Sequence, residues 1–153
     1  MRRTIYGEDH GAFGDRAAYP HWRDVPTRWK DNDVYGHVNN VVHYSLMDTV
    51  INTWLIEEAG LDVHEGRVIG LCVESHCSYR ASVSFPQVIS VGLRIGHLGR
   101  SSVRYELALF AGDTLVAEGD FTHVFVDRHT RRPVEIGPPL RPAMERLLSP
   151  PPV

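Results

Sequence analysis

The residues best suited to chemistry in this sequence are concentrated between positions 28 and 40. Two carboxylates, Asp31 and Asp33, come first, and a histidine and two asparagines follow them after Gly36. Glycine allows a positive φ or a close approach of the backbone to another group. An aspartate in such a loop can attack a carbonyl carbon or activate a water molecule against it. An ordinary turn rich in Asp, Asn and Gly is the alternative interpretation.

A long helix is predicted directly after this stretch, over residues 40–59. Apolar residues recur there at spacings of three and four, namely Met47, Val50, Ile51, Trp54 and Leu55. Asn39 is a suitable N-cap, and Gly60 suits the position after the helix. The first N–H groups of a helix lack partners within it and lie at the positive end of its dipole. They could bind a carbonyl oxygen that develops negative charge, as an oxyanion hole does.

The rest of the sequence has the alternating pattern of strands. We predict strands over residues 21–30, 67–79, 88–98, 101–110 and 114–127. In the second of these, one face would carry Ile69, Leu71, Val73, Ser75, Cys77 and Tyr79. Pro26 favours an edge position for the first strand, and Ala111–Asp113 has the composition of a hairpin turn. One strand, one long helix and four consecutive strands indicate an α+β domain in which an antiparallel sheet wraps the helix.

The composition is that of one ordinary globular domain. The chain has 153 residues, of which 42% are hydrophobic and 23% are charged, with a formal net charge of −3. A protein that binds nucleic acid through its surface is normally basic. No apolar run approaches the roughly 18 residues of a membrane span, and the N-terminus has no apolar signal-peptide core. We therefore expect a cytoplasmic protein without a nucleic-acid or membrane partner.

We divide the chain into three parts. Residues 1–20 would form a loose arm, residues 21–138 the folded domain, and residues 139–153 a proline-rich tail with a short helical segment at Arg141–Leu148. The two cysteines, Cys72 and Cys77, would point to opposite faces of one strand, and they fit a reducing compartment.

One string of residues resembles a known family. Asp33-Val-Tyr-Gly-His-Val-Asn-Asn-Val-Val-His-Tyr44, followed by a long helix, resembles the hot-dog-fold thioesterases, most closely their 4-hydroxybenzoyl-CoA thioesterase-like, YbgC-type branch. The resemblance continues at Tyr79-Arg80, Gly99–Ser102, Ala117-Glu118 and Phe125–Arg128. It covers about residues 21–138 and implies a hot-dog fold, an antiparallel sheet wrapped around one long central helix.

The same resemblance implies an activity and roles for particular residues. It implies hydrolysis of acyl-CoA to a free acid and CoA, with Asp33 as nucleophile or general base. The backbone amide of Asn40 would polarise the thioester carbonyl. No metal and no cofactor is implied, since coenzyme A is part of the substrate. The resemblance also implies a homodimer or homotetramer, with each site lying where the helix N-terminus meets a neighbouring subunit.

Four further residues are expected to bind substrate. Tyr35 and His37 belong to the loop of Asp33, while Arg80 and Arg100 could contact the phosphates of coenzyme A. A solvated surface charge is the alternative for each arginine, and support of the loop is the alternative for His37.

Other interpretations of the chemistry stay open. The substrate could be an acyl-carrier-protein thioester, or the chain could bind acyl groups without catalysis. Asp31 could share the site with Asp33 and raise the pKa of one of the two; we favour a pairing with Arg28 and turn amides. A Cys72–His76 pair is a weaker possibility than buried, structural cysteine, and the histidines have no zinc-ligand spacing.

Overall fold

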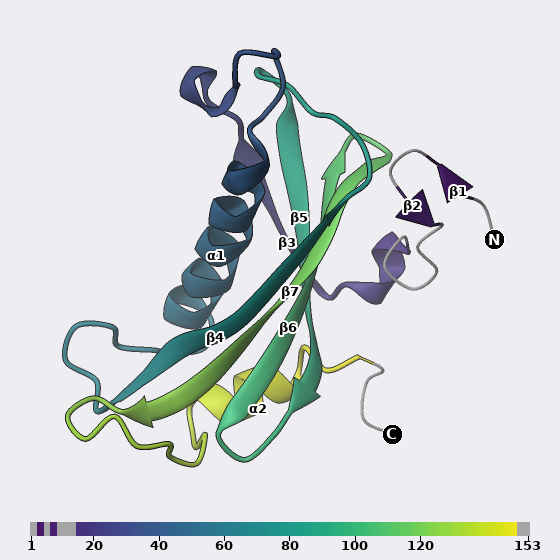
Figure 1. The fold of residues 1–153 in the computed structure, drawn as a ribbon. Coiled ribbons are helices and arrows are strands. Elements are labelled where there is room, and N and C mark those ends of the chain that lie inside the picture. The colour runs from purple at the N-terminus through teal and green to yellow at the C-terminus, as the bar shows by residue number, and fades with distance from the viewer. Residues whose placement is uncertain (1–2, 5–6, 9–14, 150–153) are drawn as a thin grey trace.

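The structure is a computed structural model that describes residues 3–4, 7–8 and 15–149. A five-stranded antiparallel sheet, in the order β3-β5-β6-β7-β4, carries one long helix on one face (Figure 1). Its strands are β3 (His21–Pro26), β4 (Val68–Tyr79), β5 (Val88–Leu98), β6 (Ser102–Ala111) and β7 (Thr114–Asp127). The helices are α1 (Asn40–Glu57) and α2 (Leu140–Glu145), and the short strands β1 (Arg3–Thr4) and β2 (Gly7–Glu8) pair with each other.

The predicted strands are confirmed, with one shortening. The expected strand 21–30 ends at Pro26, and Trp29–Asp31 form a turn of 3-10 helix instead. The reason is local: the Asp31 carboxylate accepts a hydrogen bond of 2.7 Å from the Arg28 amide, which closes a tight turn. The predicted hairpin is also present, with Gly112 at a φ of 61° between β6 and β7.

The long helix α1 is confirmed with its N-cap. The Asn39 side chain accepts a hydrogen bond of 3.2 Å from the Val41 amide, and Gly60 has a φ of 80° after the helix. The core-facing side of α1 is fully buried at Met47, Val50, Ile51 and Leu55. These side chains pack on the sheet, and each such burial contributes about 1.5–3 kcal/mol. Helix and sheet therefore share one core, and that core positions the first turn of α1.

The alternation predicted for β4 is wrong because the strand contains a bulge between Cys72 and Glu74. Cys72 lies opposite His123, whereas Glu74 lies opposite Thr122, so Val73 is an extra residue. One extra residue reverses the faces of the side chains that follow it.

The bulge corrects several expectations for β4. Leu71 lies on the opposite face from Ser75, Cys77 and Tyr79, whereas the two cysteines share a face. His76 lies on the other face from Cys72 and instead pairs with Glu74, at 3.1 Å between Nε2 and Oε1. Cys72 is exposed rather than buried, because β4 is an edge strand, while burial raises the pKa of the Cys77 thiol to about 11.

Described residues at both ends of the chain pack on the sheet. We expected a loose arm before residue 21, yet Tyr19 is only 3% exposed and packs with Ala108 and Phe110. In the expected tail, Met144 is fully buried, and the Leu147 carbonyl accepts a hydrogen bond of 2.8 Å from the Ile95 amide. The C-terminal segment up to residue 149 therefore belongs to the domain.

No helix in the described part of the chain combines the length and the apolar character that a bilayer crossing requires.

Candidate active site

The loop of Asp33 connects the 3-10 turn to α1 and lies at the N-terminal end of that helix (Figure 1). It is a tight turn, in which the Gly36 amide donates to the Asp33 carbonyl at 3.1 Å and the Asp33 amide donates to the His37 carbonyl at 2.9 Å. Gly36 has a φ of 82°, a value that side chains disfavour. The Asp33 Oδ1 accepts a hydrogen bond of 2.8 Å from the Tyr35 amide. Its Oδ2 has no partner among the described residues, so one carboxylate oxygen is available for chemistry.

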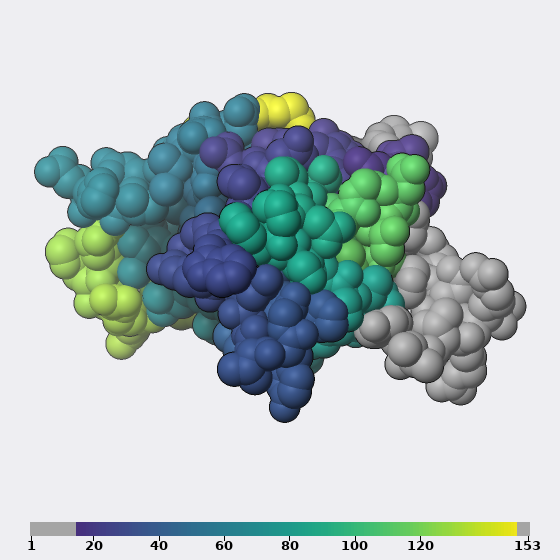
Figure 2. All heavy atoms as spheres, turned by 90° about the horizontal axis from the view of Figure 1, so that it is seen from above, coloured from purple at the N-terminus to yellow at the C-terminus, as the bar shows by residue number. Residues whose placement is uncertain are grey.

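A second segment, residues 83–85, holds this loop in place. The Val83 carbonyl accepts a hydrogen bond of 2.7 Å from the Val38 amide. The Ser84 hydroxyl donates to the Gly36 carbonyl at 2.9 Å, and the Asn32 side chain accepts from the Phe85 amide at 3.0 Å. Figure 2 shows the two segments side by side at this end of the molecule. The position of Asp33 therefore depends on residues about fifty positions along the chain.

The amide of Asn40 is the free donor in the first turn of α1. The neighbouring amides are used: Asn39 donates to the Asp31 carbonyl, Val42 to the Asn39 carbonyl, and Val41 to the Asn39 side chain. The Asn40 amide donates to no described residue, and Asn40 is exposed. An unpaired amide at the positive end of a helix dipole is a suitable donor for an oxyanion.

Asp31 has a structural role beside this site. It is 2% exposed, and its Oδ1 accepts a hydrogen bond of 2.9 Å from Arg28 Nη2. Burial alone would raise the pKa of Asp31, but the hydrogen bonds from the Arg28 side chain and amide outweigh it and lower that pKa. The pairing of Asp31 with Arg28 is therefore confirmed.

Replacing Asp31 by Asn is expected to lower the free energy of unfolding by about 1–2 kcal/mol at neutral pH, because charge-assisted hydrogen bonds are lost. A carboxylate with a depressed folded-state pKa stabilises the fold above its unfolded pKa, and this contribution disappears as the pH falls through the folded pKa. Urea unfolding of both proteins at neutral and acidic pH measures the effect. The difference in the free energy of unfolding between the two proteins should become smaller in acid. A difference that stays constant with pH would mean that the charge of Asp31 does not stabilise the fold.

Tyr35 and His37 lie on the same loop as Asp33. Tyr35 is 83% exposed, and His37 is also exposed. Three apolar side chains are also exposed: Val34 on the same loop, Trp29 on the preceding 3-10 turn and Phe85 in the segment 83–85. The structure thus brings the predicted catalytic residues and two of the predicted substrate-binding residues to one end of the molecule.

The two arginines proposed for coenzyme A have different surroundings. The Arg80 guanidinium is paired with the Glu118 carboxylate, with Nε at 3.1 Å from Oε1, and the Arg80 side chain is 16% exposed. Arg80 would have to leave Glu118 to bind a phosphate. Arg100 is exposed in the turn between β5 and β6, at the end of the sheet away from Asp33. Within one chain, Arg100 therefore lies away from the loop of Asp33, and the Arg80 guanidinium is engaged by Glu118.

Sequence reasoning missed two residues next to the site, Tyr79 and His43. The Tyr79 hydroxyl donates a hydrogen bond of 2.7 Å to the carbonyl of Asn40, and His43 is buried one helical turn along from Asn40. Tyr79 was part of the family resemblance, and no local spacing signals a bond between residues 39 positions apart.

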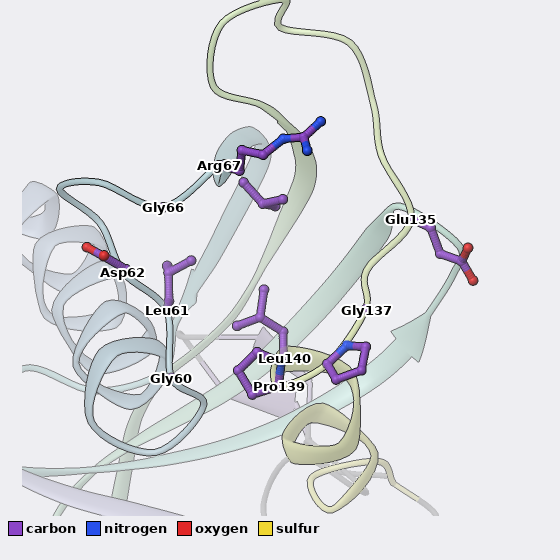
Figure 3. Close-up of a pocket in the computed structure, with 11 residues that line it drawn as sticks. Gly60, Leu61, Asp62, Gly66, Arg67, Glu135, Gly137, Pro139 and Leu140 are labelled. Carbon is purple, nitrogen blue, oxygen red and sulfur yellow. The ribbon is translucent and has the colours of Figure 1, made fainter.

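Two clefts differ in their relation to this site. One of about 270 Å³ lies beside the N-terminal half of α1, lined by β3, the 3-10 turn and the helix residues Val42, Ser45, Leu46 and Thr49. Another of about 210 Å³ lies at the opposite end of α1 (Figure 3), where Leu61, Arg67, Pro139 and Leu140 are among its lining residues. Only the first adjoins the candidate site within one chain.

No group of three or more His, Cys, Asp or Glu side chains in the described ranges is arranged to hold a metal ion. The arrangement consists of a carboxylate with one free oxygen and a helix amide without a partner. Together these groups suit attack on a carbonyl carbon whose oxygen is bound at the amide.

Comparison with known proteins defines the class. The model of the thioesterase-like superfamily matches residues 27–144. The PA5185 protein of Pseudomonas aeruginosa is 54% identical over 88% of this chain and 95% of its own, with a TM-score of 0.84. The PA2801 protein of the same organism, named as a candidate thioesterase, is 28% identical over 82% and 98%, with a TM-score of 0.77.

A more distant structure supports the fold alone. The 1,4-dihydroxy-2-naphthoyl-CoA thioesterase of Synechocystis is 16% identical over 80% of this chain and 93% of its own, with a TM-score of 0.74. No curated protein matches the chain. The chain belongs to the thioesterase-like superfamily and has the hot-dog fold. Membership of this superfamily supports thioester hydrolysis as its general activity.

Proposed function

We propose that this protein hydrolyses acyl-CoA thioesters, with the substrate carbonyl oxygen bound at the Asn40 amide and Asp33 as the reacting carboxylate. The observation that carries the proposal is the free Asn40 amide at the same end of the molecule as the free Oδ2 of Asp33. As negative charge develops on the carbonyl oxygen, this amide and the helix dipole stabilise it.

Two routes fit this arrangement. In the first, Asp33 attacks the carbonyl carbon, the CoA thiolate leaves, and water hydrolyses the resulting mixed anhydride. In the second, Asp33 takes a proton from a water molecule that attacks the carbonyl directly, and the thiolate leaves from the tetrahedral intermediate. Both routes yield a free acid and CoA, and both need the Asp33 carboxylate in its charged form.

The cleft beside α1 is suited to bind the acyl group of the acyl-CoA, and its lining favours an apolar acyl group. Val25, Pro26, Val42 and Leu46 contribute apolar lining, and Asp31, which also lines the cleft, ends the 3-10 turn just before the loop of Asp33. An acyl group placed there would have its thioester near the first turn of α1. Tyr35 and His37 are exposed on the same loop and would contact the substrate as it enters.

The test is a turnover panel that follows release of the CoA thiol from aromatic, short-chain and long-chain acyl-CoAs. Acyl-carrier-protein thioesters of the same acyl groups are assayed in parallel. Turnover of at least one acyl-CoA that exceeds turnover of its carrier-protein counterpart supports the proposal. A preference for the carrier protein would indicate the alternative substrate, and acyl binding without turnover would indicate a binding protein.

We also propose that two copies pair through the edge of β4. This strand has a neighbour in the sheet on one side only, and its apolar residues Leu71 and Val73 are 36% and 60% exposed. An uncovered edge strand presents unpaired backbone N–H and C=O groups that can form hydrogen bonds with another strand. In an antiparallel pair, the Tyr79 end of β4 would lie beside the start of β4 in the second copy. Each candidate site would then face the loop after α1 of the other copy, which also lines the cleft of Figure 3.

Light scattering at micromolar concentration is expected to show a mass of two or four chains, because a single chain leaves the β4 edge uncovered. One chain has a mass of 17.3 kDa. A fully active species of that mass would rule out a site that is shared between subunits.

A further inference from the structure

A side-chain hydrogen bond connects the first turn of α1 to the sheet. Tyr79, the last residue of β4, donates its hydroxyl to the Asn40 carbonyl at 2.7 Å. Burial, and then the neighbouring Cys77 thiol, keep the pKa of Tyr79 well above its ordinary value. The hydroxyl therefore remains protonated and acts as a donor.

The Tyr79 ring is in turn held by His43. The two rings meet edge to face, with centroids 4.9 Å apart and planes at 87°. His43 is 3% exposed, and neither of its ring nitrogens has a hydrogen-bond partner among the described residues. Burial lowers the pKa of His43, so the ring is neutral at neutral pH. It serves as a packing surface for Tyr79.

We propose that Tyr79 is a positioning residue for the thioester hydrolysis inferred above, and that His43 keeps its ring in place. The Tyr79 hydroxyl fixes the Asn40 carbonyl, and with it the orientation of the first helical turn. The Asn40 amide belongs to that turn and must point at the substrate carbonyl oxygen. The role rests on the proposed function, because it matters only if this amide binds the reacting group.

One stretch of the chain, from Tyr79 to residue 85, contacts both the loop of Asp33 and the helix that carries the Asn40 amide. Residues 83–85 hold the loop of Asp33 through three hydrogen bonds, and Tyr79, four residues earlier, holds the helix that carries the Asn40 amide. The relative placement of carboxylate and amide is thus set by the chain that leaves β4. A small change in such a placement has a large effect on rate, because reacting atoms must approach within a narrow range of geometry.

The decisive variant is Tyr79→Phe, which keeps the ring on His43 and removes only the hydroxyl. We expect kcat on the best acyl-CoA to fall by about tenfold, less than the loss of an oxyanion donor itself, because the amide is misplaced rather than removed. KM, and the binding of a non-hydrolysable thioether analogue, should stay within about twofold, since ground-state contacts are retained. Thermal unfolding should show that the fold is intact.

Tyr105→Phe is the matched control. Tyr105 also meets a histidine edge to face, at 5.0 Å from His123, but its buried hydroxyl has no hydrogen-bond partner among the described residues. The same chemical change is therefore made without loss of a hydrogen bond, and kcat should be unchanged.

Two substitutions of His43 separate positioning from general stability. His43→Phe keeps a ring against Tyr79 and should keep kcat within about threefold, whereas His43→Ala removes the support and should resemble Tyr79→Phe. The double variant His43→Ala/Tyr79→Phe should be no slower than the slower single variant, because both act through the same bond. A merely structural role would instead give additive losses that follow the stability of each variant.

The outcomes are distinguishable from a failure of the proposed function. If wild type hydrolyses acyl-CoA, Asp33→Asn is inactive and Tyr79→Phe has normal kcat, the positioning role is wrong and the function stands. If Tyr79→Phe raises KM and leaves kcat unchanged, the bond acts on substrate binding, and the proposal is also overturned. If Asp33→Asn is fully active, the function itself is wrong, whatever Tyr79 does.

Discussion

Asp33→Asn is expected to lose at least about 10²–10⁴-fold in kcat, the range that a general base contributes. Asparagine keeps the size of the side chain, and its oxygen can still accept the hydrogen bond that Oδ1 receives from the Tyr35 amide. The negative charge and the free carboxylate oxygen are lost. The effect should appear in kcat more than in KM, because most substrate contacts would lie along the acyl and pantetheine arms.

The control for Asp33→Asn is Asp31→Asn, two residues earlier, at the end of the 3-10 turn. Asp31 is buried against Arg28 and takes no part in the proposed chemistry. Its loss should reduce stability while a folded sample keeps most of its kcat. The two variants are compared by their steady-state kcat on the best acyl-CoA. The rates are measured well below the unfolding temperature of each variant. Near-normal turnover by Asp33→Asn would show that this carboxylate is neither nucleophile nor base.

Asn40→Pro is expected to lose about 10²–10³-fold in kcat, the effect of removing one oxyanion-hole donor. Proline has no amide hydrogen, so this substitution deletes the proposed donor itself. The fold should tolerate it, because Asn40 is the first residue of α1, where proline is favoured. The preceding residue, Asn39, has a φ of −59° and a ψ of 137°, an extended conformation that a following proline accepts.

Asn40→Ala is the matched control for the proline variant. Alanine keeps the amide and removes only the side chain, so kcat should fall modestly and far less than with proline. Circular dichroism and thermal unfolding establish that α1 is intact in both variants. Equal collapse of kcat in folded Asn40→Ala and Asn40→Pro would mean that the Asn40 side chain carries the chemistry. Normal turnover by Asn40→Pro would remove this amide from the mechanism.

Local patterns in the sequence were sufficient for the elements and for the loop of Asp33. The positive φ of Gly36, the N-cap at Asn39 and the start of α1 at Asn40 all follow from residues within a few positions of one another. Hydrogen bonds between near neighbours in the chain determine such a turn, so its residue types are visible in the sequence. The strands β5, β6 and β7 were predicted almost to their ends, although β5 and β7 each contain a register shift of their own.

The bulge in β4 could not be read from alternation. Val73 continues the apolar pattern of the sequence, and only pairing with β7 shows that it is the extra residue. The reversal of faces decides that Cys72 and Cys77 lie on one side of the strand and that His76 does not meet Cys72. A sheet register is set by the partner strand as well as by the strand's own residues.

The partners of charged and aromatic side chains that lie far apart in the chain were decided by the tertiary structure alone. The sequence marks Arg80 as a cation but says nothing of Glu118, which neutralises it from a strand that is 38 residues away. It marks Tyr79 as a strand residue but not as the anchor of Asn40, 39 residues back along the chain. Short-range periodicity indicates which face a residue occupies only where no bulge interrupts the strand, and hydrogen bonds between distant segments depend on how the sheet and helix pack. For that reason the turn and the helix cap at the candidate site could be predicted from the sequence, whereas the contacts that hold them in place could not.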